Sequence, residues 1–195
     1  YNIMSQIYTV KRLDSMAFEW QLKEIELTEK YDLENYNISQ TYSQISSYYI
    51  NTNQPEKALE ALKKADATAY SPTQKISVQL EYVNYYSKFG DMQAAEKILN
   101  ECKTAFDQDK RLWSIKKRLY NIEYVYYLQS KQYPKALEAA KKQEAEELNL
   151  SESIQNSVHY LTKGKIYSNM GNMSEAIKYL QMYIEAEDSL KIANE

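Results

Sequence analysis

Apolar residues recur along this chain with the three- and four-residue spacing of amphipathic helices, and short polar turns separate the apolar segments. One such stripe contains Tyr42, Ile45 and Tyr49, and it stops before the polar pair Asn53 and Gln54. A second apolar segment follows directly, with the same spacing. The pattern therefore predicts pairs of helices joined by tight turns.

Helix boundaries are marked by a few well-placed residues. Pro55 and Pro134 stand where a second helix is predicted to begin, a position at which the missing N–H of proline costs nothing. The segment 71–74, Ser-Pro-Thr-Gln, is a capping box with proline at the first helical position. Gly90 and Gly171 can adopt the left-handed conformation that ends a helix. Nearly all of the chain is therefore expected to be helical.

A tyrosine followed nine residues later by an alanine recurs in register along the chain, at intervals of 41, 37, 41 and 40 residues between successive tyrosines. The five pairs are Tyr8 and Ala17, Tyr49 and Ala58, Tyr86 and Ala95, Tyr127 and Ala136, and Tyr167 and Ala176. Residues 1–10 are predicted to belong to the first helix of this series. A repeat of fixed period predicts a solenoid, in which each hairpin buries its apolar face against its neighbours.

Residues 160–183 carry the clearest copy of the repeat. Small Gly164 allows the second helix to lie close to the first, and Ala176 is the small residue at the crossing point. The signature residues of this copy are Tyr160, Gly164, Tyr167, Gly171, Ala176, Leu180 and Tyr183. This pattern resembles the consensus of the tetratricopeptide repeat (TPR) family. The usual period is about 34 residues, so the helices here are expected to be longer by about one turn.

The resemblance implies an all-α, right-handed superhelix of about five helical hairpins, formed as one solenoid domain over residues 1–195. The predicted repeats cover approximately residues 1–32, 33–70, 71–107, 108–148 and 151–195. The sequence begins with Tyr1 and ends inside a helical pattern, so we expect a fragment of a longer protein. Leu180, Tyr183 and Leu190 fit a heptad interrupted by Glu187, and both a coiled coil running onward and a simple capping helix remain open.

Composition and charge exclude several classes of function. The net charge is −3 with mixed signs, which argues against a nucleic-acid surface. No run of about 18 apolar residues exists, so we expect no membrane insertion by this segment. Most of the 20 tyrosines are interpreted as packing residues. Cys102 takes a position that usually holds alanine in this repeat, and it is interpreted as a small buried hydrophobe.

No catalytic, metal-binding or cofactor-binding motif is found, and the chain is not predicted to be an enzyme. There is no glycine-rich phosphate loop, and a single histidine, His159, cannot form a His-paired metal site. His159 is expected to have a surface or packing role with partial exposure. A basic cluster around Trp113 and an acidic cluster are both interpreted first as solvated helix faces, and an acidic partner for the basic cluster is the alternative. Their members are Lys110, Arg111, Lys116, Lys117 and Arg118, and Glu144, Glu146 and Glu147.

The first helices of successive hairpins carry the candidate binding residues. In proteins that resemble TPRs, these helices line a concave surface that binds partners, usually peptides. Transferred to this register, the groove residues are Gln40, Ser43, Gln44, Ser47, Asn51, Glu81, Asn84, Lys88, Arg118, Asn121, Gln129, Thr162, Lys165 and Asn169. Most are amides and hydroxyls, which can donate to and accept from a peptide backbone. The alternative is that they form only the polar side of amphipathic helices.

One TPR subgroup clamps the carboxylate of chaperone tails with Lys, Asn and Arg side chains. Asn84 matches one element of that clamp and Arg118 lies near the right region. Leu80 and Ile122 stand where the clamp requires Lys and Asn. Binding of chaperone tails is therefore not predicted.

The resulting prediction is a non-catalytic module that binds a protein or peptide. The repeat length, the Tyr- and Asn-rich texture and the segment 183–190 are similar to the TPR sensor regions of Bacteroidetes membrane histidine kinases and regulators. This resemblance implies the ligand-sensing region of a two-component sensor or transcriptional regulator, with a periplasmic location favoured. The alternative is a free-standing TPR adaptor or scaffold in a protein complex, with a cytoplasmic location.

Overall fold

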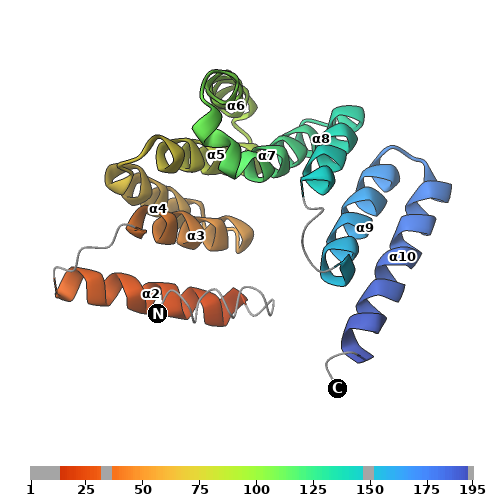
Figure 1. Cartoon of the computed structure of the whole chain (residues 1–195), viewed down its shortest axis with the longest axis horizontal. Helices are drawn as coiled ribbons and strands as arrows, with labels where there is room; N and C mark the ends of the chain where they lie inside the picture. The colour runs from red at the N-terminus through yellow and green to blue at the C-terminus, as the bar shows by residue number, and fades with distance from the viewer. Residues whose placement is uncertain (1–13, 32–36, 147–151, 193–195) are drawn as a thin grey trace. The chain divides into compact units, whose positions relative to one another are not determined.

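The computed structural model describes residues 14–31, 37–146 and 152–192, and in these ranges it contains nine α-helices, one 3₁₀ helix and no strand (Figure 1). The first helix predicted by the sequence, around residues 1–10, lies outside the described ranges. The chain forms two compact units, Tyr1–Leu112 and Trp113–Glu195. The helices are α2 (Asp14–Lys30), α3 (Ile38–Asn51), α4 (Pro55–Thr68), α5 (Pro72–Phe89), α6 (Met92–Gln108), η1 (Lys110–Ile115), α7 (Lys116–Gln129), α8 (Tyr133–Ala145), α9 (Glu152–Asn169) and α10 (Met173–Ile192).

In the first unit, α3 and α4 form a hairpin that closes through a left-handed residue. Asn53 has a φ of 59°, and Pro55 occupies the first turn of α4, as the sequence predicts. Two buried serines of α3 then hold the helices together. Ser39 Oγ donates to the Ala65 carbonyl at 2.8 Å, and Ser46 Oγ donates to the Ala58 carbonyl at 3.0 Å. Small side chains at these points let the two helices approach closely.

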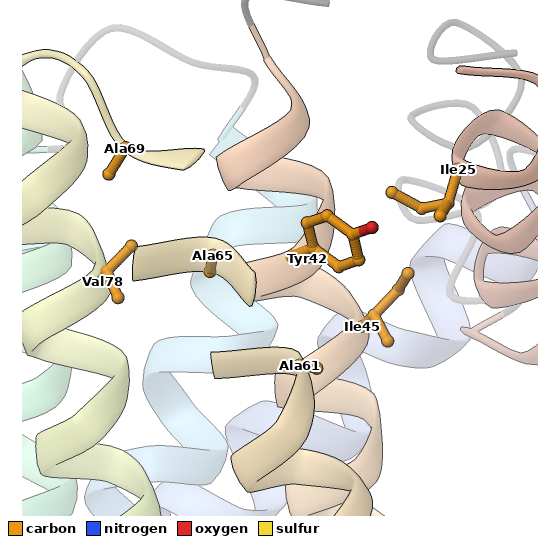
Figure 2. Close-up of a cluster of buried hydrophobic side chains, with 7 residues drawn as sticks. All are labelled: Ile25, Tyr42, Ile45, Ala61, Ala65, Ala69 and Val78. Atoms are coloured by element: carbon orange, nitrogen blue, oxygen red, sulfur yellow. The ribbon is translucent and has the colours of Figure 1, made fainter. Parts of the chain in front are cut away.

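Helix α2 packs on α3 through apolar side chains. Ile25 lies beside Tyr42 and Ile45 in a buried cluster that continues into α4 and α5 (Figure 2). Near the other end of the contact, the rings of Phe18 and Tyr48 stack with their centroids 4.0 Å apart. The second helix of one repeat thus lies against the first helix of the next, which is how a solenoid buries its apolar faces.

The hairpin of α5 and α6 follows the predicted boundaries. The capping box at the start of α5 is present, since Ser71 Oγ accepts from the Gln74 N–H and the Gln74 side chain accepts from the Ser71 N–H. Gly90 ends α5 with a φ of 98°, and the Asp91 side chain accepts from the Ala94 N–H at the start of α6. Cys102 is 1% exposed in the core, which confirms its interpretation as a small buried hydrophobe.

In the second unit, the first helix of the fourth hairpin starts differently from the prediction. Residues Lys110–Ile115 form a 3₁₀ helix, and the α-helix begins only at Lys116. Lys131, with a φ of 60°, turns the chain into α8. A cluster of Ala136, Ala140 and Ile166 then joins α8 to α9.

The α9–α10 hairpin has the close contact that its sequence predicts. Gly164 faces Leu180, and Ala176 is 2% exposed. Gly171 has a φ of 75° and turns the chain between the two helices. His159, however, is only 5% exposed, so the expectation of partial exposure was wrong. It lies on the packed side of α9 because that helix is covered by neighbours on more than one face, α8 and α10.

These features confirm the predicted fold class, an all-α solenoid of TPR-like hairpins. The prediction that all repeats form one continuous domain stays a prediction, because the two units are described separately.

Candidate functional site

Helix α3 presents most of its candidate residues along one face. Gln40 and Asn51 are exposed, and Gln44 and Ser47 are half-buried between them. Their spacing of four, three and four residues places them on one side of the helix. Ser43 is different, because it is 1% exposed and its hydroxyl donates to the Ser39 carbonyl at 3.0 Å. Ser43 is therefore a packing residue and presents no group to a ligand in this structure.

Helix α5 carries a second polar face that is hydrogen-bonded to the first. Ser47 Oγ donates to Glu81 Oε2 at 2.8 Å, across from α3 to α5. Asn84 Nδ2 donates to the same oxygen at 3.3 Å. Glu81 is only 6% exposed, whereas Asn84 is half-buried and Lys88, one turn further, is exposed. The two faces therefore form one continuous polar surface.

Gln21 extends this surface onto α2, although the sequence analysis did not include it. Gln21 is 5% exposed, and its Nε2 donates to Gln44 Oε1 at 3.0 Å. The repeat register places a large apolar residue at this position, so a glutamine there was the available signal. A buried amide with a partner on the next first helix fixes the orientation of Gln44.

The remaining candidates lie in the second unit. Asn121, Gln129, Lys165 and Asn169 are exposed, and Arg118 is half-buried. Asn169 Nδ2 donates to the Lys165 carbonyl of its own helix at 2.8 Å.

Thr162 of the same set is also half-buried and hydrogen-bonds to the hydroxyl of Tyr124, which links α9 to α7. Burial raises the pKa of Tyr124, and the Thr162 hydrogen bond partly opposes that rise. In the second unit the candidates are thus a looser set than on α3 and α5.

Charged side chains that sequence clusters suggested to be solvated are in part paired. Arg111 binds the Asp109 carboxylate with two nitrogens, and this hydrogen bonding lowers the pKa of Asp109. Lys116 contacts Glu146 at 3.1 Å, and this contact raises the pKa of Lys116.

Glu144 of the acidic cluster is held by Lys163 from α9 at 2.6 Å, with the lysine side chain only 12% exposed. Glu144 therefore belongs to the packing between hairpins, which corrects its interpretation as a solvated helix end; Glu147 lies outside the described residues.

The titratable groups of the described helices show no arrangement suited to chemistry. Burial raises the pKa of the Cys102 thiol to about 12, so the thiolate that a nucleophile needs is disfavoured. In the described ranges, no cluster of three or more His, Cys, Asp or Glu side chains has the geometry to hold a metal ion. None of the described helices combines the length and apolar character needed to cross a membrane.

Comparison with solved structures identifies several similar folds. The chain is similar to BtubC (BKLC) from P. vanneervenii, with a TM-score of 0.58 and 13% identity over 96% of this chain and 78% of that one. It is similar to MamA, with a TM-score of 0.50 and 19% identity over 96% of each chain. A kinesin light chain from Podosopora anserina with nearly identical TPR-like repeats gives a TM-score of 0.51 and 16% identity over 97% and 94%. At these identities the likeness shows the fold alone.

Comparison with curated proteins finds no match. Two family models do match the chain. A model for the tetratricopeptide repeat covers residues 160–189, the copy in which the sequence signature is clearest. A model for the 26S proteasome subunit RPN7 covers residues 9–140, more than half of the chain. The protein therefore belongs to the RPN7 family of helical-repeat proteins, and its last hairpin is a tetratricopeptide repeat.

Proposed function

We propose that this chain is a protein-interaction module that binds a peptide segment of its partner along the first helices of the first unit. Repeats of the TPR type generally mediate protein interactions, and the fold places no catalytic group at this surface. We call the site the α3–α5 polar surface. It consists of Gln40, Gln44, Ser47, Asn51, Glu81, Asn84 and Lys88.

The observation that carries this proposal is the hydrogen-bonded link between the two helices. Glu81 Oε2 accepts from both Ser47 and Asn84, at 2.8 and 3.3 Å. These bonds hold the side chains in place before a ligand arrives, so less rotamer entropy is lost on binding. The Asn84 amide keeps further donor and acceptor capacity, which suits a peptide N–H or C=O.

Exposed polar groups flank this link at both ends of the surface. Gln40 and Asn51 lie eleven residues apart on α3, about 16 Å along a helix at 1.5 Å per residue. An extended peptide of about five residues covers that length. Lys88 adds a positive charge near the Asn51 end of the register. A short extended segment with polar backbone contacts, and an acidic group near one end, fits these features.

The family favours one biological role for this surface over the other. The family model describes a subunit of a larger protein assembly, the 26S proteasome. An adaptor or scaffold role in a protein complex is in keeping with such a family. The role as a ligand-sensing region of a membrane signalling protein stays a prediction from the sequence resemblance. In either role, the surface would act by binding a partner segment.

A displayed library of short peptides, selected on the intact chain, tests the proposal. The dissociation constant of a selected peptide is then measured for wild type and for Gln40→Ala with Asn51→Ala. Both residues are exposed, so the fold should be kept. We expect binding to weaken by about tenfold, the loss of roughly 1.4 kcal/mol.

A matched control removes the same two residue types from α6. Gln93→Ala with Asn100→Ala alters exposed positions of the second helix in the next hairpin. It should leave the dissociation constant unchanged. Equal loss in both variants, no loss in either, or no selected peptide at all would refute binding at the α3–α5 polar surface.

A further inference from the structure

The outward face of α10 carries a stripe of large apolar side chains that nothing in the second unit covers. Met173 is 55% exposed, and Ile177 and Ile184 are each 57% exposed. Their spacing of four and seven residues places them on one side of the helix. The opposite side of α10 packs on α9 through Ala176 and Leu180. Solenoids usually end in a polar outer face, so an apolar one indicates a contact surface.

The repeat register shows what this face does elsewhere in the chain. Ile177 and Ile184 stand one and eight residues after the repeat alanine, Ala176. On α2 the same positions, counted from Ala17, hold Phe18 and Ile25.

Both α2 residues are covered by α3, the first helix of the next repeat. Phe18 stacks on Tyr48 at 4.0 Å, and Ile25 is 8% exposed beside Tyr42 and Ile45 (Figure 2).

On α8 the corresponding face also contacts the following first helix, but with different chemistry. The position of Ile184 is taken there by Glu144, which binds Lys163 of α9 at 2.6 Å. Lys163 stands four residues before the repeat tyrosine, where α3 has Ile45. A helix with a lysine there would set its ammonium against Ile184. The α10 face therefore matches a helix of the α3 kind, apolar at this position.

The covering positions lie seven, four and one residues before the repeat tyrosine. In α3 they hold Tyr42, Ile45 and Tyr48, and α3 is already seated on α2. The later first helices each carry a polar side chain at one of these positions. Those side chains are Gln79, Glu123 and Lys163. Counted from Tyr8, residues 1–13 supply three apolar residues there, Tyr1, Met4 and Ile7.

We propose that the exposed apolar face of α10 in one copy of this protein receives residues 1–13 of a second copy. The contact repeats the pairing of α2 with α3, so that Ile184 meets Met4 as Ile25 meets Ile45. The two surfaces differ, so the association is heterologous and joins copies head to tail. Such contacts either close into a ring or continue as a filament.

Site-directed disulfide formation between two copies of the full chain tests the pairing. One chain carries Ile184→Cys and the other Met4→Cys, and they are mixed under mild oxidation. We expect a crosslinked dimer of the two different chains. Cys102 is 1% exposed and should not react. The control Ser174→Cys, at an exposed position outside the apolar stripe, should give at least tenfold less crosslink with the Met4→Cys chain.

Solution mass provides the second measurement. Wild type should grow in mass with concentration, whereas Ile177→Glu with Ile184→Glu, and separately Met4→Glu with Ile7→Glu, should each remain single chains. Mixing the two variants should restore only a dimer, because one intact interface remains. Thermal melting by circular dichroism checks that both variants are folded.

Three results would overturn the proposal. Wild type could remain a single chain at every concentration. Ile184→Cys could crosslink only with itself, which indicates a symmetric contact between two α10 helices. Association could also survive both pairs of glutamates, which places the contact elsewhere.

Discussion

Leu180 occupies the space that a side chain at Gly164 would need. A Cβ built on Gly164 would lie 2.9 Å from both Cδ2 and Cγ of Leu180, and 3.5 Å from its backbone nitrogen. Real Cβ contacts are not that short, so α9 and α10 can be this close only because residue 164 has no side chain. The contact joins the two helices at their crossing point, beside buried Ala176.

Gly164→Ala should therefore destabilise the protein although alanine favours helix. The helix gain is about 1 kcal/mol, whereas overpacking costs about 1–3 kcal/mol, so we expect a net loss of about 1 kcal/mol. Urea unfolding measures it. In a Leu180→Ala background the clash is gone, and the same Gly164→Ala change should become stabilising. Destabilisation of equal size in both backgrounds would mean that Leu180 is not the cause.

Buried serines on two first helices should respond to alanine in opposite ways. Ser87 is 4% exposed, and its hydroxyl is the one buried side-chain polar atom among the described residues that has no hydrogen-bond partner. Ser87→Ala should raise stability by up to about 1 kcal/mol, because it removes an unsatisfied group. Ser46→Ala should lower stability by about 1 kcal/mol, because Ser46 donates to the Ala58 carbonyl at 3.0 Å. Thermal melts of both variants decide this, and a fall in melting temperature for Ser87→Ala would contradict it.

The ion pair of Glu144 and Lys163 should contribute more to stability than an exposed pair on one helix. The Lys163 side chain is 12% exposed, so solvent screens the pair only in part. A double-mutant cycle with Glu144→Gln and Lys163→Met should give a coupling of about 1–2 kcal/mol.

The comparison pair is Glu138 with Lys142, whose side chains are 65% and 50% exposed at 2.7 Å. Its cycle should give about 0.3–0.5 kcal/mol, and added salt should lower it further. Equal couplings in the two cycles would show that burial of Lys163 does not strengthen its pair.

Burial of Cys102 should make the protein less stable at high pH. The thiol pKa rises from 9.0 to about 12 in the folded state, mainly by desolvation and in addition because of Glu101. Unfolding therefore releases a proton between these values, and this contribution to stability, complete below pH 9.0, declines as pH rises toward about 12.

Urea unfolding at about pH 8 and about pH 10 measures the slope for wild type and Cys102→Ala. The variant should lose less stability, with a difference of up to about 1.4 kcal/mol per pH unit for one group. Tyr42, whose pKa rises from 10.0 to about 12 through burial and the Glu29 carboxylate, titrates in both proteins and cancels in the comparison. Parallel slopes would show that the Cys102 thiol ionises in the folded state as it does in the unfolded one.

Sequence reasoning located turns and close contacts because they depend on local backbone chemistry. Only glycine adopts a φ of 98° without strain, and only a missing N–H makes proline neutral at the first turn of a helix, so Gly90 and Pro55 could be placed from the sequence. The same reasoning was wrong about His159 and Ser43. Their burial depends on which faces of their helices are covered, and helical periodicity alone does not give that.

The amino-acid sequence by itself determined the repeat: the spacing of Tyr167 and Ala176, recurring along the chain, specifies helical hairpins of about 40 residues. Only the tertiary structure decided which polar side chains bind one another. Ser47 and Glu81 lie 34 residues apart and Lys163 and Glu144 lie 19 apart, and those pairs follow from how successive hairpins pack. It also decided that Ile184 is exposed while Ile25, at the same position of its repeat, is buried. Exposure depends on the presence of a covering helix, and a residue's own sequence neighbourhood does not contain that information.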